Sequence, residues 1–429
     1  MRFVSTREGT EPVTLGTAIR EGIAADGGLF VPERLPSRSW SGLPSLRLPV
    51  LAIELILPFA EGDPLQESLD DVSREAFNFP APLVALEGSR EPTYALELFH
   101  GPTCAFKDFG ARFLAAALER IPRPGDRRTT ILVATSGDTG GAVAAAFHGR
   151  PWVDVVLLYP RGLVSQRQAH QLSCWGGNVR TFAVHGTFDD CQRIVKEAFK
   201  DPTLTKRHAL SSANSINPGR LLPQMVYYAS ASLEIRQRHG RPANFIVPSG
   251  NLGNVTACVW ARAIGLPIDD IVLATNENRT VTEFLETGEW RPRESVATLA
   301  SAMDVGNPSN MERLRALLGD GLRDALEAHL VSDDEIRATI REDAATLGYV
   351  WDPHGATAAR VYRRLARERT DKPWVLVATA HPAKFNEIVE PLIGRDVPVP
   401  PALARLLDLR RQEEDLDPTL DALRDRLTR

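Results

Sequence analysis

A single lysine, Lys107, stands between phenylalanines at the end of a glycine- and proline-containing loop. The stretch His100 to Phe113 reads HGPTCAFKDFGARF, and its second half has a helical pattern. Phe106, Phe109 and Phe113 supply apolar surroundings, and desolvation disfavours an ammonium ion, so we expect a lowered pKa for Lys107. A neutral amine is a nucleophile. Its usual use in a buried place is a Schiff base with the carbonyl of a substrate or of pyridoxal phosphate.

The alternative is an ordinary lysine at the start of a helix, with its stem on a phenylalanine and its ammonium in water. Lysine is scarce in this chain, and arginine supplies most of the positive charge. The other lysines are Lys196, Lys200, Lys206, Lys372 and Lys384. Three loops elsewhere in the chain favour the chemical role for Lys107.

The loop 249–254, Ser-Gly-Asn-Leu-Gly-Asn, lies between an expected strand and an expected helix. Glycines let backbone N–H groups approach an anion, and a helix N-terminus adds positive potential, so a phosphate fits there. The loop is not GxGxxG and lacks the lysine of a P-loop, which argues against dinucleotide or nucleoside triphosphate binding. Turn formation alone is the alternative.

Two further loops have the composition of anion sites. Loop 135–141 offers the hydroxyls of Ser136 and Thr139 beside an acid, Asp138. Loop 211–220, SSANSINPGR, offers neutral donors and the guanidinium of Arg220, which suits a phosphate or carboxylate. Turn chemistry alone explains any one of these loops, but three of them in one chain with a Schiff-base candidate make that explanation much weaker.

The elements that must position these loops alternate along the chain. Strand patterns are followed by helical patterns, which implies right-handed crossovers and parallel sheets. We expect strands at 130–134, 153–159, 179–184, 245–248, 271–274 and 374–379, and helices at 142–147, from 165, 188–200, 221–239 and 255–264. Two parallel sheets fit this count, the smaller one within roughly 128–213.

Composition excludes several classes of protein. The net charge is 50 − 55 = −5 and no basic stripe is present, so nucleic acid and membrane surfaces are poor partners. No apolar run has the length of a membrane span, and the N-terminus lacks the pattern of a secretory signal. The cysteines have no metal spacing and fit reduced thiols in the cytoplasm. They are Cys104, Cys174, Cys191 and Cys258.

Several blocks together resemble one family. In chain order they are VSTR, DGGLFVPE, LFHGPTCAFKDFG, ATSGDTGGAV, SSANSINPGR, VPSGNLGN, MDVGNPSN and ATAHPAKF. The set is similar to threonine synthases of the bacterial and fungal type, which are fold-type II pyridoxal-phosphate enzymes of the tryptophan synthase beta-like superfamily.

The resemblance implies two parallel-sheet α/β domains with additions at both ends. The expected parts are an N-terminal segment 1–90, a large cofactor-binding domain 91–127 and 214–395, a small α/β domain 128–213, and a C-terminal helical tail 396–429. The cofactor that the resemblance implies is pyridoxal 5'-phosphate, and no metal is expected.

The resemblance also implies roles for individual residues. Lys107 forms the Schiff base and shuttles protons, Thr379 bonds the pyridine nitrogen, and Asp138 lies near the cofactor ring, where the wider fold type often has asparagine. The expected phosphate ligands are the backbone N–H groups of Gly250, Asn251, Leu252, Gly253 and Asn254. The expected substrate ligands are Ser136, Thr139, Asn214, Ser215 and Arg220.

The implied reaction converts O-phospho-L-homoserine and water to L-threonine and phosphate. The implied enzyme is cytoplasmic, a monomer or a homodimer, and acts on a small molecule. Three alternatives stay open from sequence: a phospholyase that releases 2-oxobutanoate, a serine or threonine dehydratase of the same fold, and a non-catalytic relative that binds a metabolite. We interpret His100 and His381, which flank the expected site, as structural hydrogen bonders or cofactor contacts.

Overall fold

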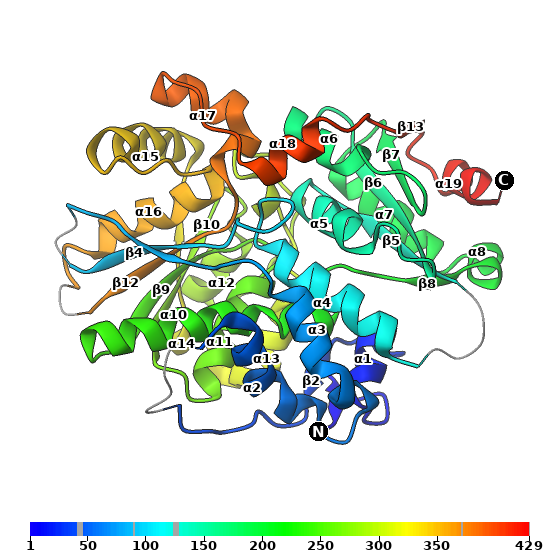
Figure 1. Ribbon diagram of the computed structural model, residues 1–429, viewed down its shortest axis with the longest axis horizontal. Coiled ribbons are helices and arrows are strands. Elements are labelled where there is room, and N and C mark those ends of the chain that lie inside the picture. Colours follow the sequence, from blue (N-terminus) through cyan, green and yellow to red (C-terminus); the bar gives the residue numbers. More distant parts are fainter. Residues whose placement is uncertain (41–45, 89–90, 123–127, 370–371, 429) are drawn as a thin grey trace.

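Two large parallel sheets form the centre of the protein (Figure 1). The computed structural model describes residues 1–40, 46–88, 91–122, 128–369 and 372–428. Within them the larger sheet has six strands in the order β11-β10-β9-β12-β4-β3, parallel except for β3 with β4. Its strands are β3 (Leu83–Ala85), β4 (Thr93–Glu97), β9 (Ala243–Pro248), β10 (Ile268–Thr275), β11 (Glu327–Leu330) and β12 (Trp374–Ala378).

The second sheet has five described strands in the order β13-β7-β6-β5-β8, and all its pairs are parallel. Its strands are β5 (Thr129–Ala134), β6 (Val153–Pro160), β7 (Val179–Val184), β8 (Ala209–Ser211) and β13 (Glu413–Leu416). Two parallel sheets with helical crossovers confirm the fold class that the sequence predicts.

Helices cover both sheets. Among the described residues, no helix combines the length and the apolarity that crossing a membrane requires. The α-helices are α1 (Leu15–Glu21), α2 (Leu48–Ala60), α3 (Leu69–Ala76), α4 (Lys107–Arg120), α5 (Asp138–Phe147), α6 (Gln166–Ser173), α7 (Phe188–Ala198), α8 (Pro202–Arg207), α9 (Pro218–Leu221), α10 (Gln224–His239), α11 (Gly253–Ala263), α12 (Thr280–Thr287), α13 (Met311–Leu318), α14 (Leu322–Ala325), α15 (Asp333–Thr346), α16 (Pro353–Leu365), α17 (Asn386–Ile393), α18 (Pro401–Leu407) and α19 (Leu420–Thr428).

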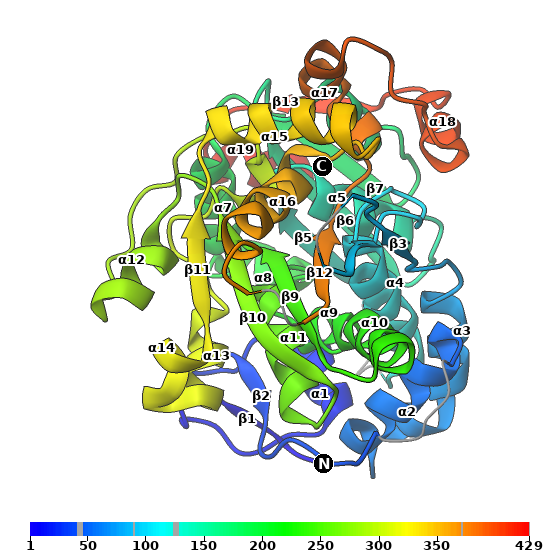
Figure 2. The ribbon, with the colours of Figure 1, turned by 90° about the vertical axis from the view of Figure 1, so that its left-hand side faces the viewer.

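The two faces of the six-stranded sheet bury different side chains. Val375 and Val377 of β12 belong to the hydrophobic core shared with α10 and α11, whereas Trp374 and Leu376 belong to the core beneath α16. Side chains alternate between faces along a strand, so a continuous apolar run serves both cores. Figure 2 shows α16 over one face and α10 with α11 over the other.

The N-terminal segment is tied to the larger sheet's helices. Its strands β1 (Phe3–Ser5) and β2 (Phe30–Pro32) pair antiparallel. The indole N–H of Trp40 donates to the carbonyl of Ile264, after α11, at 2.9 Å. The guanidinium of Arg313, on α13, donates to the carbonyl of Phe30 at 3.0 Å. These bonds connect the segment to elements that carry the site described below.

The C-terminal segment differs from the expected helical tail. It contains α18 and α19, but it also contributes β13 to the edge of the five-stranded sheet beside β7. Its sequence Glu-Glu-Asp-Leu has the composition of a solvated stretch. It can nevertheless form a strand, because charged side chains are common on the edge strands of sheets. Here the charges have partners: Tyr159 donates to Glu413 at 2.6 Å and Arg180 pairs with Glu414 at 2.9 Å. The domain boundaries expected from sequence stay a prediction.

Candidate active site

The residues proposed from sequence gather where parallel strands end. Strand β12 ends directly before Thr379, β9 ends before loop 249–254, and β5 ends before loop 135–141. In open α/β sheets, ligands bind at the carboxyl ends of the strands, because the loops there converge. The topology therefore brings loops from distant parts of the chain to one side of the molecule.

Lys107 is fixed at the end of β12. It is the first residue of α4. Directly before it, Ala105 forms an antiparallel bridge with Ala380, and the N–H of Phe106 donates to the carbonyl of Thr379 at 2.8 Å. The resemblance assigns Lys107 and Thr379 to the same cofactor. This short backbone pairing holds the two residues close together.

The environment of Lys107 favours its neutral form. Its side chain is half-buried by surface area, and its Nζ lies 5.4 Å from the centre of the Phe106 ring. Burial lowers the pKa of Lys107 to about 8; the Asp138 carboxylate opposes this shift, and the cations Arg220 and Lys384 reinforce it. The lowered pKa expected from the sequence is confirmed.

Asp138 is the first residue of α5 and is buried, while Ser136 and Thr139 beside it are half-buried. Burial alone raises the pKa of the Asp138 carboxyl, but the charges of Lys384 and Lys107 outweigh it, so the pKa lies well below its ordinary value. Asp138 is therefore an anion beside Lys107. Among the described residues, no hydrogen bond joins Ser136 or Thr139 to loop 211–220.

Loop 249–254 has the geometry of an anion cradle. Leu252 has a φ of 61°, a left-handed conformation that costs a non-glycine residue about 1 kcal/mol. A Cβ at Gly250 would lie 2.6 Å from the Cα of Met303, so only glycine fits. In the part of the chain that the structure describes, the backbone N–H groups of residues 250–254 make no hydrogen bond with the protein.

Asn254 ends this loop with one unpaired donor. Its Oδ1 accepts hydrogen bonds from the hydroxyls of Tyr227 and Tyr228, at 2.6 and 2.8 Å. Its Nδ2 is buried and has no hydrogen-bond partner among the described residues. A buried donor left without a partner costs free energy, so this N–H₂ group suits a bound anion.

Loop 211–220 is held against the cradle. The Oγ of Ser215 accepts hydrogen bonds from Nδ2 of Asn251 at 2.7 Å and from Nδ2 of Asn310 at 3.4 Å. Arg313, fully buried on α13, donates to the carbonyl of Ser215 at 3.2 Å and to Oδ1 of Asn310 at 2.7 Å. Asn214 precedes Ser215 and is half-buried. The structure thus joins loop 211–220 directly to loop 249–254.

Arg220 is a buried cation at the end of this loop. It is 3% exposed, and one guanidinium nitrogen donates to the carbonyl of Ala213. Its Nε is buried without a hydrogen-bond partner among the described residues. Burial lowers the pKa of Arg220 to about 10, against the charge of Asp108. A guanidinium with spare donors beside Lys107 is suited to an anionic substrate group.

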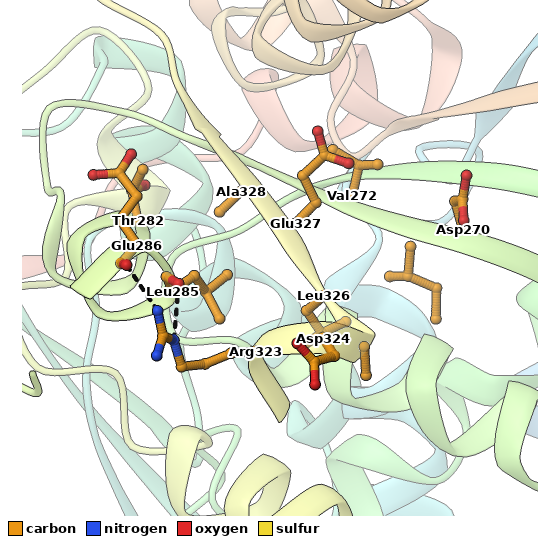
Figure 3. Close-up of a pocket in the computed structure, with 12 residues that line it drawn as sticks. Asp270, Val272, Thr282, Leu285, Glu286, Arg323, Asp324, Leu326, Glu327 and Ala328 are labelled. Atoms are coloured by element: carbon orange, nitrogen blue, oxygen red, sulfur yellow. Dashed lines mark hydrogen bonds between the residues drawn. The ribbon is translucent and has the colours of Figure 1, made fainter. Parts of the chain in front are cut away.

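A cavity of about 360 Å³ opens at the opposite end of the six-stranded sheet (Figure 3). It lies where β10 and β11 begin, beside α12 and α14. Arg323 in its wall already donates to the carbonyls of Leu285 and Glu286, at 3.0 and 2.7 Å. Because it lies at the amino ends of the strands, this cavity is separate from the site around Lys107.

Comparison with known proteins identifies the family. A family described as "Pyridoxal-phosphate dependent enzyme" matches residues 75–380, more than half of the chain. Those described as "Threonine synthase N terminus" and "Threonine synthase, C-terminal" match residues 2–77 and 355–426. A threonine synthase of Haemophilus influenzae is 41% identical over 428 residues, which cover 99% of both chains. The chain belongs to the threonine synthase family.

Solved structures of threonine synthases share its fold. The crystal structure of threonine synthase from Escherichia coli superposes with a TM-score of 0.90 at 39% identity, covering 100% of this chain and 99% of the other. A pyridoxal-phosphate-bound threonine synthase from Brucella melitensis also has a TM-score of 0.90, at 34% identity and with 100% and 98% covered. This member of the threonine synthase family is a lyase that depends on pyridoxal phosphate.

The residues present fit that cofactor. A phosphate needs several donors that the protein leaves unpaired, and loop 249–254 offers free N–H groups together with Nδ2 of Asn254. An aldehyde needs a neutral amine, and Lys107 has its pKa lowered to about 8. Among the described residues, no group of three or more metal-ligating side chains is present.

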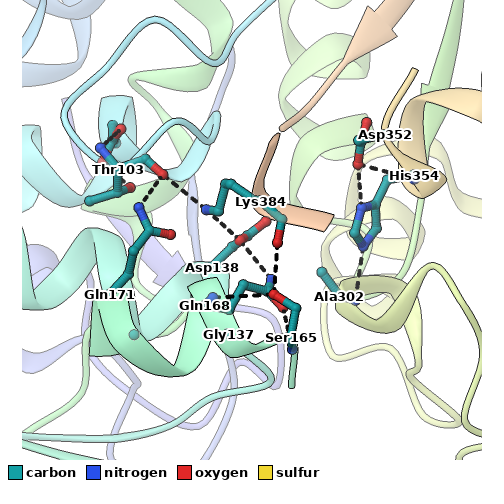
Figure 4. A network of polar contacts seen from close by, with 12 residues as sticks. Thr103, Gly137, Asp138, Ser165, Gln168, Gln171, Ala302, Asp352, His354 and Lys384 are labelled. Atoms are coloured by element: carbon teal, nitrogen blue, oxygen red, sulfur yellow. Dashed lines mark hydrogen bonds and ion pairs between the residues drawn. The ribbon is translucent and has the colours of Figure 1, made fainter. Parts of the chain in front are cut away.

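Sequence reasoning missed three polar residues of this site. Lys384 is fully buried and forms an ion pair with Asp138 (Figure 4), whereas Asn310 and Arg313 hold loop 211–220. Two signals were available: Lys384 lies in ATAHPAKF, and Asn310 lies in MDVGNPSN. Arg313 has no comparable signal, because a helical arginine is usually exposed.

The two flanking histidines have structural contacts. His100 pairs with Glu97 at 2.8 Å, and Tyr349 donates to the same carboxyl group at 2.9 Å. Burial lowers the pKa of His381 to about 4, and its Nδ1 accepts the N–H of Ala383 at 3.1 Å. His381 is therefore a neutral cap of the turn after β12, in line with the interpretation from sequence.

Proposed function

We propose that this enzyme converts O-phospho-L-homoserine and water to L-threonine and phosphate. The observation that carries the proposal is a single activated amine, Lys107, with unpaired anion-binding groups on two separate elements. One group is Asn254 with its loop, and the other is Arg220. An enzyme whose cofactor and substrate both carry a phosphate requires two such anion-binding sites.

The cofactor seat is proposed from the residues around Lys107. Lys107 would carry the cofactor, the N–H groups of Gly250–Asn254 would hold its phosphate, and the hydroxyl of Thr379 would bond its ring nitrogen. Asp138 would lie near the ring. Bound in this way, pyridoxal phosphate supplies an electron sink for carbanions next to the amino group of the substrate.

The substrate seat is proposed from the remaining loops. Arg220 would form a two-point contact with a phosphate or carboxylate, because its fork of donors matches a pair of oxygens. The hydroxyls of Ser136 and Thr139 would bind from the side of α5. Asn214 and Ser215 would bind from loop 211–220, which Arg313 fixes in place.

The reaction needs a mobile proton, and Lys107 would be the group that moves it. The substrate loses one proton from Cα and one from Cβ, and the Cγ–O bond then breaks with its electron pair leaving on phosphate. Cγ gains a proton and becomes the methyl group. Hydroxide from water bonds to Cβ, the remaining proton of water goes to the released phosphate, and Cα regains its proton. An amine whose pKa is about 8 exchanges protons readily near neutral pH.

The setting of the reaction is also a proposal. All four cysteines are buried and unpaired, which supports a reducing compartment such as the cytoplasm. The proposed reaction uses a small molecule and water, so it requires neither nucleic acid nor a membrane. A monomer or a homodimer is proposed.

Product analysis tests the function. Purified enzyme loaded with pyridoxal phosphate is given O-phospho-L-homoserine, and threonine, phosphate and 2-oxobutanoate are measured. We expect threonine and phosphate in equal amounts. Formation of 2-oxobutanoate without threonine would establish the phospholyase alternative instead, and conversion of unphosphorylated serine or threonine would favour a dehydratase.

A further inference from the structure

A buried ion pair joins Lys384 to Asp138 (Figure 4), and both charges act on Lys107. The Nζ of Lys384 is 2.6 Å from Oδ1 of Asp138, and both side chains are 3% exposed or less. Gln168 donates from Nε2 to the same Oδ1 at 2.9 Å. The Lys384 ammonium also donates to the carbonyl of Thr103 at 2.9 Å. One cation thus connects α5 with the loop that leads into Lys107.

The position of Lys384 is fixed from the side of α6. The Oγ of Ser165 donates to the carbonyl of Lys384 at 2.8 Å, and Arg167 donates to the carbonyl of Ala383 at 2.5 Å. Gln171 donates to the Thr103 carbonyl at 3.0 Å, so the acceptor of Lys384 is fixed as well. The ammonium therefore has little freedom to leave Asp138.

Stability alone does not account for this pair. Removing two charges from water costs several kcal/mol per ion, and apolar residues of similar size are often as stable or more stable. A buried pair at this place therefore points to a functional use. The Asp138 carboxylate also affects Lys107, because its negative charge favours the ammonium form of that residue.

The Arg220 guanidinium also lowers the pKa of Lys107, and more strongly than Lys384 does, but it bonds to the carbonyl of Ala213 and not to Asp138. Arg220 on α9 is a cation, and Asp108 on α4 is occupied by the N–H and hydroxyl of Thr103, at 2.8 and 2.6 Å. His354 on α16 accepts the N–H of Ala302 at Nε2, 3.0 Å away, so its proton lies on Nδ1 toward Asp352. Among the described residues, Lys384 is the cation in direct contact with Asp138.

We infer that Lys384 is a positioning residue for Lys107: its ammonium neutralises the Asp138 carboxylate, which would otherwise hold Lys107 in its protonated, unreactive form. The pair leaves the Lys107 amine available to attack an aldehyde while an anion remains at residue 138. The inference rests on the proposed role of Lys107, but its test needs no substrate turnover.

The test measures the pKa of Lys107 through its reactivity. Full-length protein freed of cofactor is treated with trace acetic anhydride between pH 6 and 11, and acetylation of the Lys107 peptide is followed by mass spectrometry. Only the neutral amine reacts: its nitrogen bonds to the acetyl carbon, acetate leaves, and a proton is released. The pH midpoint of labelling therefore gives the pKa of Lys107.

Charge-removing variants should shift this midpoint in opposite directions. In Lys384→Met we expect it to rise by about one unit, so that labelling at pH 7.5 is about tenfold slower. In Asp138→Asn we expect it to fall by a similar amount, and in the double variant we expect a value near that of the original protein. Lys384→Arg keeps the charge and should keep the midpoint.

A remote lysine provides the matched control. Lys372 forms an ion pair with Asp269 at the other end of the sheet, so Lys372→Met should leave the midpoint of Lys107 unchanged. Circular dichroism checks that each variant is folded. If Lys384→Met does not fold, Asp138→Asn and the double variant, which leaves no unpaired buried charge, decide the question. Unchanged midpoints, or shifts in the same direction for both single variants, would overturn the inference.

Discussion

The guanidinium of Arg220 lies against Gly110 of helix α4. A Cβ at residue 110 would be 2.9 Å from Nε of Arg220 and 2.7 Å from its carbonyl oxygen. Gly110 lies one helical turn after Lys107, so the same helix carries the amine and the surface on which Arg220 rests. The distance between the proposed nucleophile and the proposed anion ligand is therefore set by a residue without a side chain.

Gly110→Ala should disturb the substrate seat. The added methyl group must displace the backbone or the guanidinium of Arg220, because no room for it exists, and we expect a loss of about 1–3 kcal/mol in the free energy of unfolding. The KM for O-phospho-L-homoserine should rise more than kcat falls. Urea denaturation and steady-state kinetics measure the two effects.

Gly321→Ala is the control for that substitution. No heavy atom lies within 4 Å of a Cβ at residue 321, and its φ of −76° is allowed for alanine. We expect unchanged kinetics and a stability that is equal or higher by up to about 1 kcal/mol. Equal behaviour of the two alanine variants would contradict the role given to Gly110.

Arg220→Lys should weaken substrate binding severely although it keeps the charge. A lysine ammonium lacks the planar fork of donors, and the buried space left by the guanidinium is not refilled. We expect kcat/KM to fall by about 30–1000-fold, the range for disrupting a buried charged contact. Arg238→Lys, which alters an exposed ion pair with Glu234, should have no effect. A tenfold or smaller loss in Arg220→Lys would count against the assignment.

Much of the fold was predictable because parallel strands are continuous apolar runs. The expected strand at 179–184 coincides with β7, and the one at 153–159 is one residue shorter than β6. Strand β4 escaped prediction, although it lies between β12 and β3, because Thr93–Glu97 is short and does not follow a helical crossover. Strand β13 also escaped prediction. Its charged side chains are tolerated because it lies at the edge of the sheet, and that position depends on the assembled sheet and not on the local sequence.

The site was predictable only as separate loops. Motifs such as SGNLGN indicate an anion cradle through local backbone chemistry, which the sequence contains. The pairing of Lys384 with Asp138 joins residues far apart in the chain and depends on how η4 (Pro382–Phe385) packs on α6. No local pattern encodes such a contact, so the sequence offered no reason to assign Lys384 a role within its motif.

Asn254→Asp should separate cofactor binding from folding. The carboxylate keeps acceptors for the Tyr227 and Tyr228 hydroxyls, but it removes the unpaired Nδ2 donor and adds a negative charge beside the proposed phosphate. We expect the dissociation constant for pyridoxal phosphate to rise by about 100-fold, or roughly 3 kcal/mol. Fluorescence titration measures the affinity, and the thermal midpoint of the cofactor-free variant serves as control. Undiminished affinity would remove Asn254 from the site.

Lys107→Met should abolish turnover and yet stabilise the cofactor-free protein at neutral pH. The pKa of Lys107 is about 8 in the folded protein and about 10.4 in an unfolded chain, so the unfolded chain binds the proton more tightly. As pH falls from about 10.4 to 8, the original protein therefore loses stability relative to the methionine variant, and below pH 8 the difference is constant. We expect a gain of about 1–3 kcal/mol at pH 7 that disappears above pH 10.5.

Urea denaturation of both proteins at pH 7 and at pH 10.5 checks this dependence. A gain that is equal at both pH values would reflect better packing by methionine and not the ionisation of Lys107. Lys372→Met, which removes an ammonium from an ion pair with Asp269 near the surface, should show no such gain at either pH. A gain in stability that occurs at pH 7 and not at pH 10.5 would show that burial of the Lys107 amine costs stability. The fold would then keep this amine buried for catalysis, as expected where stability and activity are in conflict.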